Sequence, residues 1–230
     1  MRAAVAGIIV ALSALRAEAG AWPREEGTTF ISLSQVFTTG TESLLAPTET
    51  LTSYSSLYAE YGLTGTTTIG FDAAYGTGPE ARLGTGIAFV RRPIWETPSG
   101  HRFAADFGVG WRTESGDQDV RLRPGLAWGR GFESAWGNGW MGVDASAELL
   151  LPSDDTAFKV DFTTGVKPSD DWMLIFQVQT GRYAGTGALV RVAPSVVRAF
   201  GEKSHLQIGL DATVFGDDSI GVKLATWFSF

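Results

Sequence analysis

Hydrophobic and polar residues alternate with a period of two along most of this chain. The alternation is clearest in residues 68–75, 103–111, 158–166, 206–214 and 220–230. A period of two places successive side chains on opposite faces of a β-strand. No stretch after residue 19 has apolar residues at the i, i+3, i+4, i+7 spacing of an amphipathic helix. The pattern therefore predicts a single all-β domain.

Clusters of Gly, Pro, Asp and Ser divide the pattern into twelve predicted strands. These span residues 27–38, 50–63, 66–76, 81–92, 101–112, 119–130, 137–150, 157–166, 172–183, 187–200, 204–215 and 218–230. A tilted strand needs about 9–11 residues to cross a bilayer, and membrane barrels of bacteria have an even number of strands. The predicted fold is a closed antiparallel transmembrane β-barrel of about 12 strands, with about 10 or 14 if one hairpin is miscounted.

A soluble β-sandwich would also alternate, so further features must separate it from a membrane barrel. The polar face is rich in Gly, Ser, Thr and charges of both signs, which suits a crowded, wet lumen. Aromatic residues gather near the strand ends in two sets, as in the two girdles of an outer-membrane barrel. One set is Tyr54, Tyr75, Trp111, Phe158, Tyr183 and Phe215; the other is Phe30, Trp95, Phe103, Trp128, Trp136, Trp140, Trp172, Phe200, Phe228 and Phe230.

The lengths of the connections also favour a membrane barrel. If both chain ends are periplasmic, several predicted periplasmic connections are short and the first external connection is the longest. The segments 93–100 and 131–136 are two exceptions, because they are longer than periplasmic turns usually are. Pro194 falls within a predicted strand, and we expect a bulge or bend there because proline cannot donate to the strand ladder.

The start of the chain has the pattern of a secretory signal peptide. A basic Met1-Arg2 precedes an apolar run at residues 3–15 and small residues at 17–19. The apolar run is shorter than the about 20 residues that span a bilayer. The alternative is a buried N-terminal helix. We expect cleavage after Ala19, with Ala21 as a possible second site, so that residues 1–19 are the signal peptide and 20–230 form the barrel.

The end of the chain is a strand that runs to the last residue, KLATWFSF, with Phe228 and Phe230 on one parity. Together with the signal peptide and the alternating chain, this ending resembles the outer-membrane β-barrel proteins of Gram-negative bacteria. The resemblance implies the bacterial outer membrane as location, with its lipid and lipopolysaccharide as surroundings. It also implies that Phe228 and Phe230 act as the signal read by the barrel-assembly machinery. More loosely, AWPREEGTTFISLS and VAPSVV resemble the outer-membrane channels of the meta-pathway of phenol degradation.

Composition and charge exclude several other classes. The chain has a formal net charge of −7 at pH 7, whereas nucleic-acid binding needs clustered Lys and Arg. It has no Cys, so neither disulfides nor thiolate metal sites are available. Acidic residues mark most predicted external loops, but none has the spacing of a calcium loop. The sequence therefore indicates no nucleic-acid partner, no metal and no cofactor.

Catalytic residues are not evident either. An outer-membrane lipid-modifying enzyme would use a His-based site near the outer leaflet, but His101 and His205 both fall at predicted periplasmic strand starts. No nucleophile elbow, P-loop or zinc-protease motif is present in the sequence. We therefore expect that the protein is not an enzyme and that both histidines are interfacial.

Charged residues on the inward parity are the candidate functional residues. Turn positions pair Glu148 with Lys159, Arg123 with Asp144, and Asp211 with Lys223, so acidic and basic groups are expected to meet inside the barrel. The predicted lumen lining is Arg121, Arg123, Asp144, Glu148, Lys159, Asp161, Arg191, Asp211 and Lys223.

Two interpretations of these charges remain open. They can line a constriction that selects small solutes, or they can neutralise one another and plug the barrel. A barrel of about twelve strands is wider than the about eight whose interior side chains can fill, which favours a passage. The sequence therefore predicts an outer-membrane channel or transporter for small solutes. A sealed structural or adhesive barrel is the second hypothesis and a lipid-modifying enzyme the third, and the oligomeric state is left open.

Overall fold

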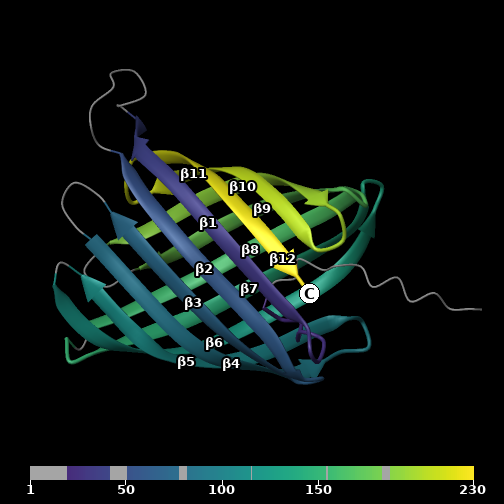
Figure 1. Ribbon diagram of the computed structural model, residues 1–230, viewed down its shortest axis with the longest axis horizontal. Helices are drawn as coiled ribbons and strands as arrows, with labels where there is room; N and C mark the ends of the chain where they lie inside the picture. Colours follow the sequence, from purple (N-terminus) through teal and green to yellow (C-terminus); the bar gives the residue numbers. More distant parts are fainter. Residues whose placement is uncertain (1–19, 42–50, 78–81, 115, 154, 183–186) are drawn as a thin grey trace, which may run out of the picture.

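Twelve antiparallel strands form a closed barrel in the structure, a computed structural model that describes residues 20–41, 51–77, 82–114, 116–153, 155–182 and 187–230 (Figure 1). The strands are β1 (Thr29–Gly40), β2 (Thr52–Thr64), β3 (Thr67–Thr77), β4 (Arg82–Glu96), β5 (His101–Glu114), β6 (Asp117–Ser134), β7 (Gly137–Leu151), β8 (Asp155–Ser169), β9 (Trp172–Arg182), β10 (Ala188–Phe200), β11 (Ser204–Phe215) and β12 (Ser219–Ser229). The predicted fold class is confirmed, with twelve strands rather than 10 or 14.

Each strand pairs with its neighbours in sequence, and the sheet closes where β1 pairs with β12. Figure 1 shows these two strands side by side although they lie at opposite ends of the chain. At this seam Thr29 and Phe230 exchange two backbone hydrogen bonds, with N···O distances of 2.6 and 3.0 Å. Closure leaves no strand edge unpaired, which is the condition for a β-sheet to exist in lipid.

The barrel has two different ends. We call the end that carries both Thr29 and Phe230 the turn end, and the opposite end the loop end. The two long connections predicted at the turn end are shorter than expected, because β4 continues to Glu96 and β6 to Ser134. Turns at 97–100 and 135–136 remain. The longest predicted connection is at the loop end, and its residues 42–50 lie outside the described residues.

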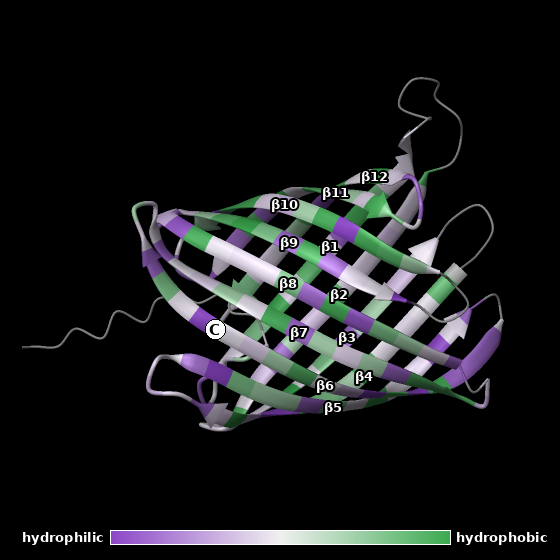
Figure 2. Ribbon diagram, turned by 180° about the vertical axis from the view of Figure 1, so that it is seen from behind, coloured by the Kyte–Doolittle hydropathy of each residue, from purple (hydrophilic) through white to green (hydrophobic). Residues whose placement is uncertain are grey.

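Burial alternates along the strands with the pattern predicted from sequence, and Figure 2 shows the same alternation as bands of hydropathy along the ribbons. On β5, for example, Ala104 is buried whereas Phe107 is half-exposed. Buried residues face the lumen, and the exposed apolar residues form the outer surface. Within the described part of the chain, no helix is long and apolar enough to span a membrane.

The aromatic sets agree only in part with the prediction. Of the predicted aromatic residues, those exposed at the turn end are Trp95, Trp136, Trp172, Phe200, Phe228 and Phe230, and those exposed at the loop end are Tyr54, Tyr75, Trp111, Phe158 and Phe215; Tyr183 lies outside the described residues. The prediction is wrong for Phe30 and Trp140, which face the lumen. Both have the inward parity of their strands, and proximity to a strand end does not reveal the face.

The expected bulge at Pro194 is also absent. Pro194 lies opposite Phe176 of β9 in an unbroken register, and the register of β10 with β11 is the same on both sides of it. The irregularity in β10 is between Val190 and Arg191 instead. Proline therefore costs one ladder hydrogen bond here without inserting an extra residue.

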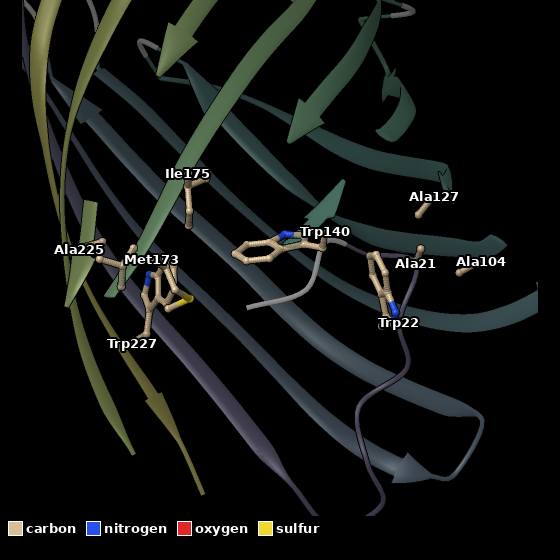
Figure 3. Close-up of a cluster of buried hydrophobic side chains, with 10 residues drawn as sticks. Ala21, Trp22, Ala104, Ala127, Trp140, Met173, Ile175, Ala225 and Trp227 are labelled. Atoms are coloured by element: carbon tan, nitrogen blue, oxygen red, sulfur yellow. The ribbon is translucent and has the colours of Figure 1, made fainter. Parts of the chain in front are cut away.

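The hydrophobic core is inside the barrel, near the turn end. Residues 20–28, which we call the inner segment, precede β1; Ala21 and Trp22 are buried inside the lumen, whereas residues 25–27 are exposed. Figure 3 shows Ala21 and Trp22 of this segment near Ala104 and Ala127, while Trp140 lies between them and a second group on the opposite wall. The second group contains Met173, Ile175, Ala225 and Trp227.

Candidate functional site

The nine charged residues predicted to line the lumen all lie on the inward parity of their strands. Arg121 and Arg123 share a face of β6 with the buried Ala127. Asp144 and Glu148 share a face of β7 with the buried Trp140 and Leu150. The remaining five are Lys159 and Asp161 on β8, Arg191 on β10, Asp211 on β11 and Lys223 on β12.

The predicted cross-strand partners are wrong. Glu148 lies opposite Ala157 rather than Lys159, and Asp211 lies opposite Gly221 rather than Lys223. Asp144 lies opposite Ala127 on β6, four positions from Arg123. Each predicted register is displaced by an even number of residues, which changes the partner but keeps the face.

The ion pairs that form connect other partners. Arg121 pairs with Glu148 across β6 and β7. Lys159 pairs with Asp161 on the same strand at 2.7 Å. The shortest contact between Arg191 and Asp211 is 4.0 Å. Acidic and basic groups therefore meet on this part of the wall, as predicted, but in different combinations.

A second cluster of charges is formed by β2, β4, β5 and the inner segment. Glu60 of β2 accepts a hydrogen bond from Arg91 of β4 and another from Arg24 of the inner segment, each with an N···O distance of 2.5 Å. The Arg91 guanidinium also lies 3.8 Å from Asp106 of β5. Glu60 is only 4% exposed and Arg91 9%. We call Arg24, Glu60, Arg91 and Asp106 the lumenal ion network.

Aromatic rings hold this network in place. The Tyr58 hydroxyl donates to Glu60 at 2.5 Å, and the Tyr58 ring stacks on Phe89 with a centroid distance of 5.9 Å. The guanidinium groups of Arg91 and Arg123 lie over the Phe89 ring, at 5.1 and 5.5 Å from its centroid. Arg123 also contacts Asp72 of β3 at 3.3 Å. Cation–π contacts of this kind stabilise desolvated guanidinium groups.

The inner segment is fixed to the wall by hydrogen bonds and close packing. The amide of Arg24 donates to Thr68 at 3.0 Å, and the amide of Gly27 donates to the carbonyl of Gly62 at 2.8 Å. Gly62 has no Cβ, and one built there would collide with the backbone of Glu25. Likewise a Cβ at Gly129 would collide with the Trp22 ring. The barrel wall therefore has glycines where the inner segment passes.

The two histidines contact aromatic residues near the turn end. His101 accepts a hydrogen bond at Nδ1 from the Trp128 indole at 3.1 Å, and the two rings stack. The centroid of the His205 ring lies 6.1 Å from the centroid of the Trp227 ring, with the two planes tilted. Among the described residues no group of three or more His, Cys, Asp or Glu could hold a metal ion.

No family model matches the sequence, and no curated protein matches it. Solved structures do match its fold. An outer membrane channel from Pseudomonas putida F1 superposes with a TM-score of 0.64 at 10% identity, covering 94% of this chain and 100% of the channel. KdgM porin, solved with disordered oligogalacturonate, has a TM-score of 0.61 at 7% identity, covering 87% of this chain and 99% of the porin. NanC porin also has a TM-score of 0.61 at 9% identity, covering 86% of this chain and 98% of the porin.

The fold is that of the outer-membrane β-barrels. The resemblance seen in the sequence is thus confirmed at the level of the fold, and similar structures include an outer membrane channel and porins. Sequence identities of 7–10% carry no information on solute.

Sequence reasoning missed the lumenal ion network. Its three wall residues, Glu60, Arg91 and Asp106, have the inward parity of predicted strands, so the alternation that identified Arg121 and Asp144 could have found them. Arg24 gives no such signal, because residues 20–28 do not alternate. The course of the inner segment follows from packing inside the closed barrel.

Proposed function

We propose that the protein is an outer-membrane channel for passive or facilitated diffusion of small solutes through its charged lumen. The observation that carries this proposal is the lumen itself. Its wall has paired charges of both signs, and these groups face a space enclosed by twelve strands. Rings of charged side chains are a common basis of selectivity in pores. The structural similarity to an outer membrane channel and two porins supports the same function.

The proposed setting is the bacterial outer membrane, reached after cleavage of residues 1–19. The exposed apolar belt and aromatic ends would contact lipid and lipopolysaccharide there. Phe228 and Phe230, at the end of β12, are the proposed contact with the barrel-assembly machinery. We propose that the turn end, which carries Thr29 and Phe230, would face the periplasm.

A sealed barrel with a structural or adhesive role is the second candidate. The inner segment favours it, because Trp22 and the lumenal Trp140 and Trp227 occupy the turn end of the lumen. A lipid-modifying enzyme is not favoured, since His101 and His205 contact aromatic rings.

Single-channel recording of the folded protein in planar bilayers separates the first two candidates. A channel should give conductance steps above background. A protein that is folded, as judged by its heat-modifiable migration on gels, and that gives no steps would rule out the channel.

Ion selectivity then shows whether the paired charges line the path. Arg121→Glu makes the lumen more negative and places a second carboxylate beside Glu148, so it should increase the preference for cations. The swap Arg121→Glu with Glu148→Arg keeps both the net charge and the ion pair, and it should return the reversal potential towards that of the wild type. If Arg121→Glu lowers stability but leaves the reversal potential unchanged, the pair plugs the barrel instead of lining a path.

A further inference from the structure

We propose that the lumen contains a binding site for the chain's own N-terminal ammonium group, and that the carboxylate of Asp144 is its main ligand. The site would be completed by hydrolysis of the Ala19–Gly20 peptide bond by the signal peptidase of the exporting cell. This hydrolysis consumes one water and leaves a carboxylate on Ala19 and an ammonium on Gly20. The proposal rests on cleavage at this bond and is independent of whether solutes pass through the barrel.

The position of Gly20 is the first observation. Gly20 lies inside the barrel, against the side chains of Asp144 on β7 and Arg91 on β4. A Cβ built on Gly20 would collide with the Asp144 carboxylate and would lie 3.0 Å from the Arg91 guanidinium carbon. The main chain of residue 20 is therefore close enough to Asp144 for a terminal ammonium to contact it.

The balance of charge around Asp144 is the second observation. In the lumenal ion network two guanidinium groups, Arg24 and Arg91, face two carboxylates, Glu60 and Asp106, so the network is neutral. Asp144 lies near the Arg91 guanidinium, but among the described residues no hydrogen bond or ion pair joins it to a partner, and Arg91 is bound to Glu60. Asp144 is partly buried, and an unpaired carboxylate in such a place costs free energy.

The nearest wall lysine does not correct this imbalance. Asp161 of β8 lies directly opposite Asp144 and adds a second negative charge, and Lys159 forms its ion pair with Asp161, at 2.7 Å. An ammonium at Gly20 would neutralise the negative charge of Asp144 and donate charge-assisted hydrogen bonds to its carboxylate. Before cleavage residue 20 has an uncharged peptide nitrogen, so only the processed chain has this contact.

The residues after Gly20 explain why the ammonium would stay in place. Ala21 is 1% exposed and Trp22 is 8% exposed, and both pack in the core cluster inside the barrel. Arg24 is bound by Glu60 and Thr68. Cleavage after Ala21 would remove Gly20, which lies against the Asp144 carboxylate, together with the buried Ala21, and would leave Trp22 as the terminus. The packing therefore favours the Ala19–Gly20 bond over the second site.

Limited proteolysis of the mature protein tests the proposal. Trypsin can cut after Arg24 only when the inner segment leaves the lumen, so the rate of this cut reports release of the segment. Four mature chains that start at Gly20 are compared in detergent: the wild type, Asp144→Asn, Asp161→Asn as the matched control, and the wild type refolded with an acetylated Gly20 amine.

We expect cleavage after Arg24 to be about tenfold faster in Asp144→Asn and in the acetylated chain than in the wild type, as for the loss of a charge-assisted hydrogen bond. Asp161→Asn should be close to the wild type. Mass spectrometry of the exported protein should give Gly20 as its first residue.

Two results would overturn the proposal. One is an exported protein that begins at Trp22. The other is an acetylated chain that is as resistant as the wild type. The acetylated chain keeps every side chain, so it decides the question even if Asp144→Asn fails to fold. A channel that conducts but shows no effect of acetylation would refute this site and leave the proposed function intact.

Discussion

Glu60 shows how a barrel can contain charge at a position that is almost closed to water. Its two oxygens accept hydrogen bonds from Arg24, Arg91 and Tyr58, so its lone pairs are well satisfied. A buried ion pair adds little net stability over an apolar pair, but the loss of one partner leaves the other charge unpaired. Glu60 therefore neutralises Arg24 and Arg91 in the lumen and binds the inner segment to β2.

Glu60→Gln should destabilise the barrel. The substitution leaves Arg24 and Arg91 without their shared counter-ion, and the expected loss is about 3–5 kcal/mol in the free energy of unfolding. Urea unfolding in detergent, followed by tryptophan fluorescence, measures it. Glu114→Gln is the control, because Glu114 pairs with Arg112 at the loop end, where its side chain is 50% exposed. Equal effects of the two substitutions would contradict the importance of the network.

The strands show why faces were predictable from the sequence and partners were not. The predicted register of a hairpin depends on which residue is taken as the centre of its turn. If that centre is wrong by one position, the residue predicted to lie opposite a given side chain is wrong by two positions. On β8 this moves the partner of Glu148 from Lys159 to Ala157. A shift of two keeps every side chain on its face, so Glu148 still faces the lumen. Alternation therefore predicted the face on which the nine charged residues lie but could not predict their ion pairs.

The ends of β4 and β6 and the course of the inner segment could not be predicted from the sequence, for a different reason. β4 runs past Pro93 and β6 past Gly131, although such residues usually mark turns, because the neighbouring strand still offers ladder partners. Residues 20–28 have no period, and their place in the lumen depends on Gly62 and Gly129 in distant strands. These are tertiary effects that no local pattern records.

Removal of the inner segment should open the lumen. We expect a chain that lacks residues 20–26 to give larger single-channel conductance than the wild type, because Trp22 and Arg24 no longer occupy the turn end. Trp22→Ala, which keeps the rest of the segment and its hydrogen bonds, should give an intermediate value. Planar-bilayer recordings of the three proteins compare them directly. Conductance that is unchanged by the deletion would mean that the narrowest part of the path lies elsewhere.

At the scale of the whole molecule, the exposed apolar belt is the feature that requires a bilayer. Leu126 of β6 is 60% exposed on the outer face, in a row with other apolar residues of that strand. Leu126→Arg should lower the stability in lipid by about 2–4 kcal/mol if the position is near the bilayer midplane. The control Leu126→Phe stays apolar and should have a small effect. Reversible unfolding from lipid vesicles measures both, and a tolerated arginine would place Leu126 outside the hydrocarbon region.

Closure between the first and last strands depends on every other strand being present and in register. Pairing of β1 with β12 is therefore a measure of whether the complete barrel has formed. Leu33 of β1 lies opposite Thr226 of β12, and both have the outward parity. The natural chain has no cysteine, so a pair introduced here has no competing thiol.

Leu33→Cys with Thr226→Cys should cross-link under mild oxidation or with a short thiol-reactive linker, since opposite residues have Cβ atoms about 4.5–5.5 Å apart. The cross-linked chain should migrate differently on a denaturing gel. Leu33→Cys with Val222→Cys is the matched control, because Val222 lies opposite Phe37, four positions along β1. Equal cross-linking of the two pairs would mean a seam without fixed register, and no cross-linking of either would mean an open barrel. A bond confined to the first pair would connect residues about two hundred positions apart in the sequence, which only a closed twelve-stranded sheet brings together.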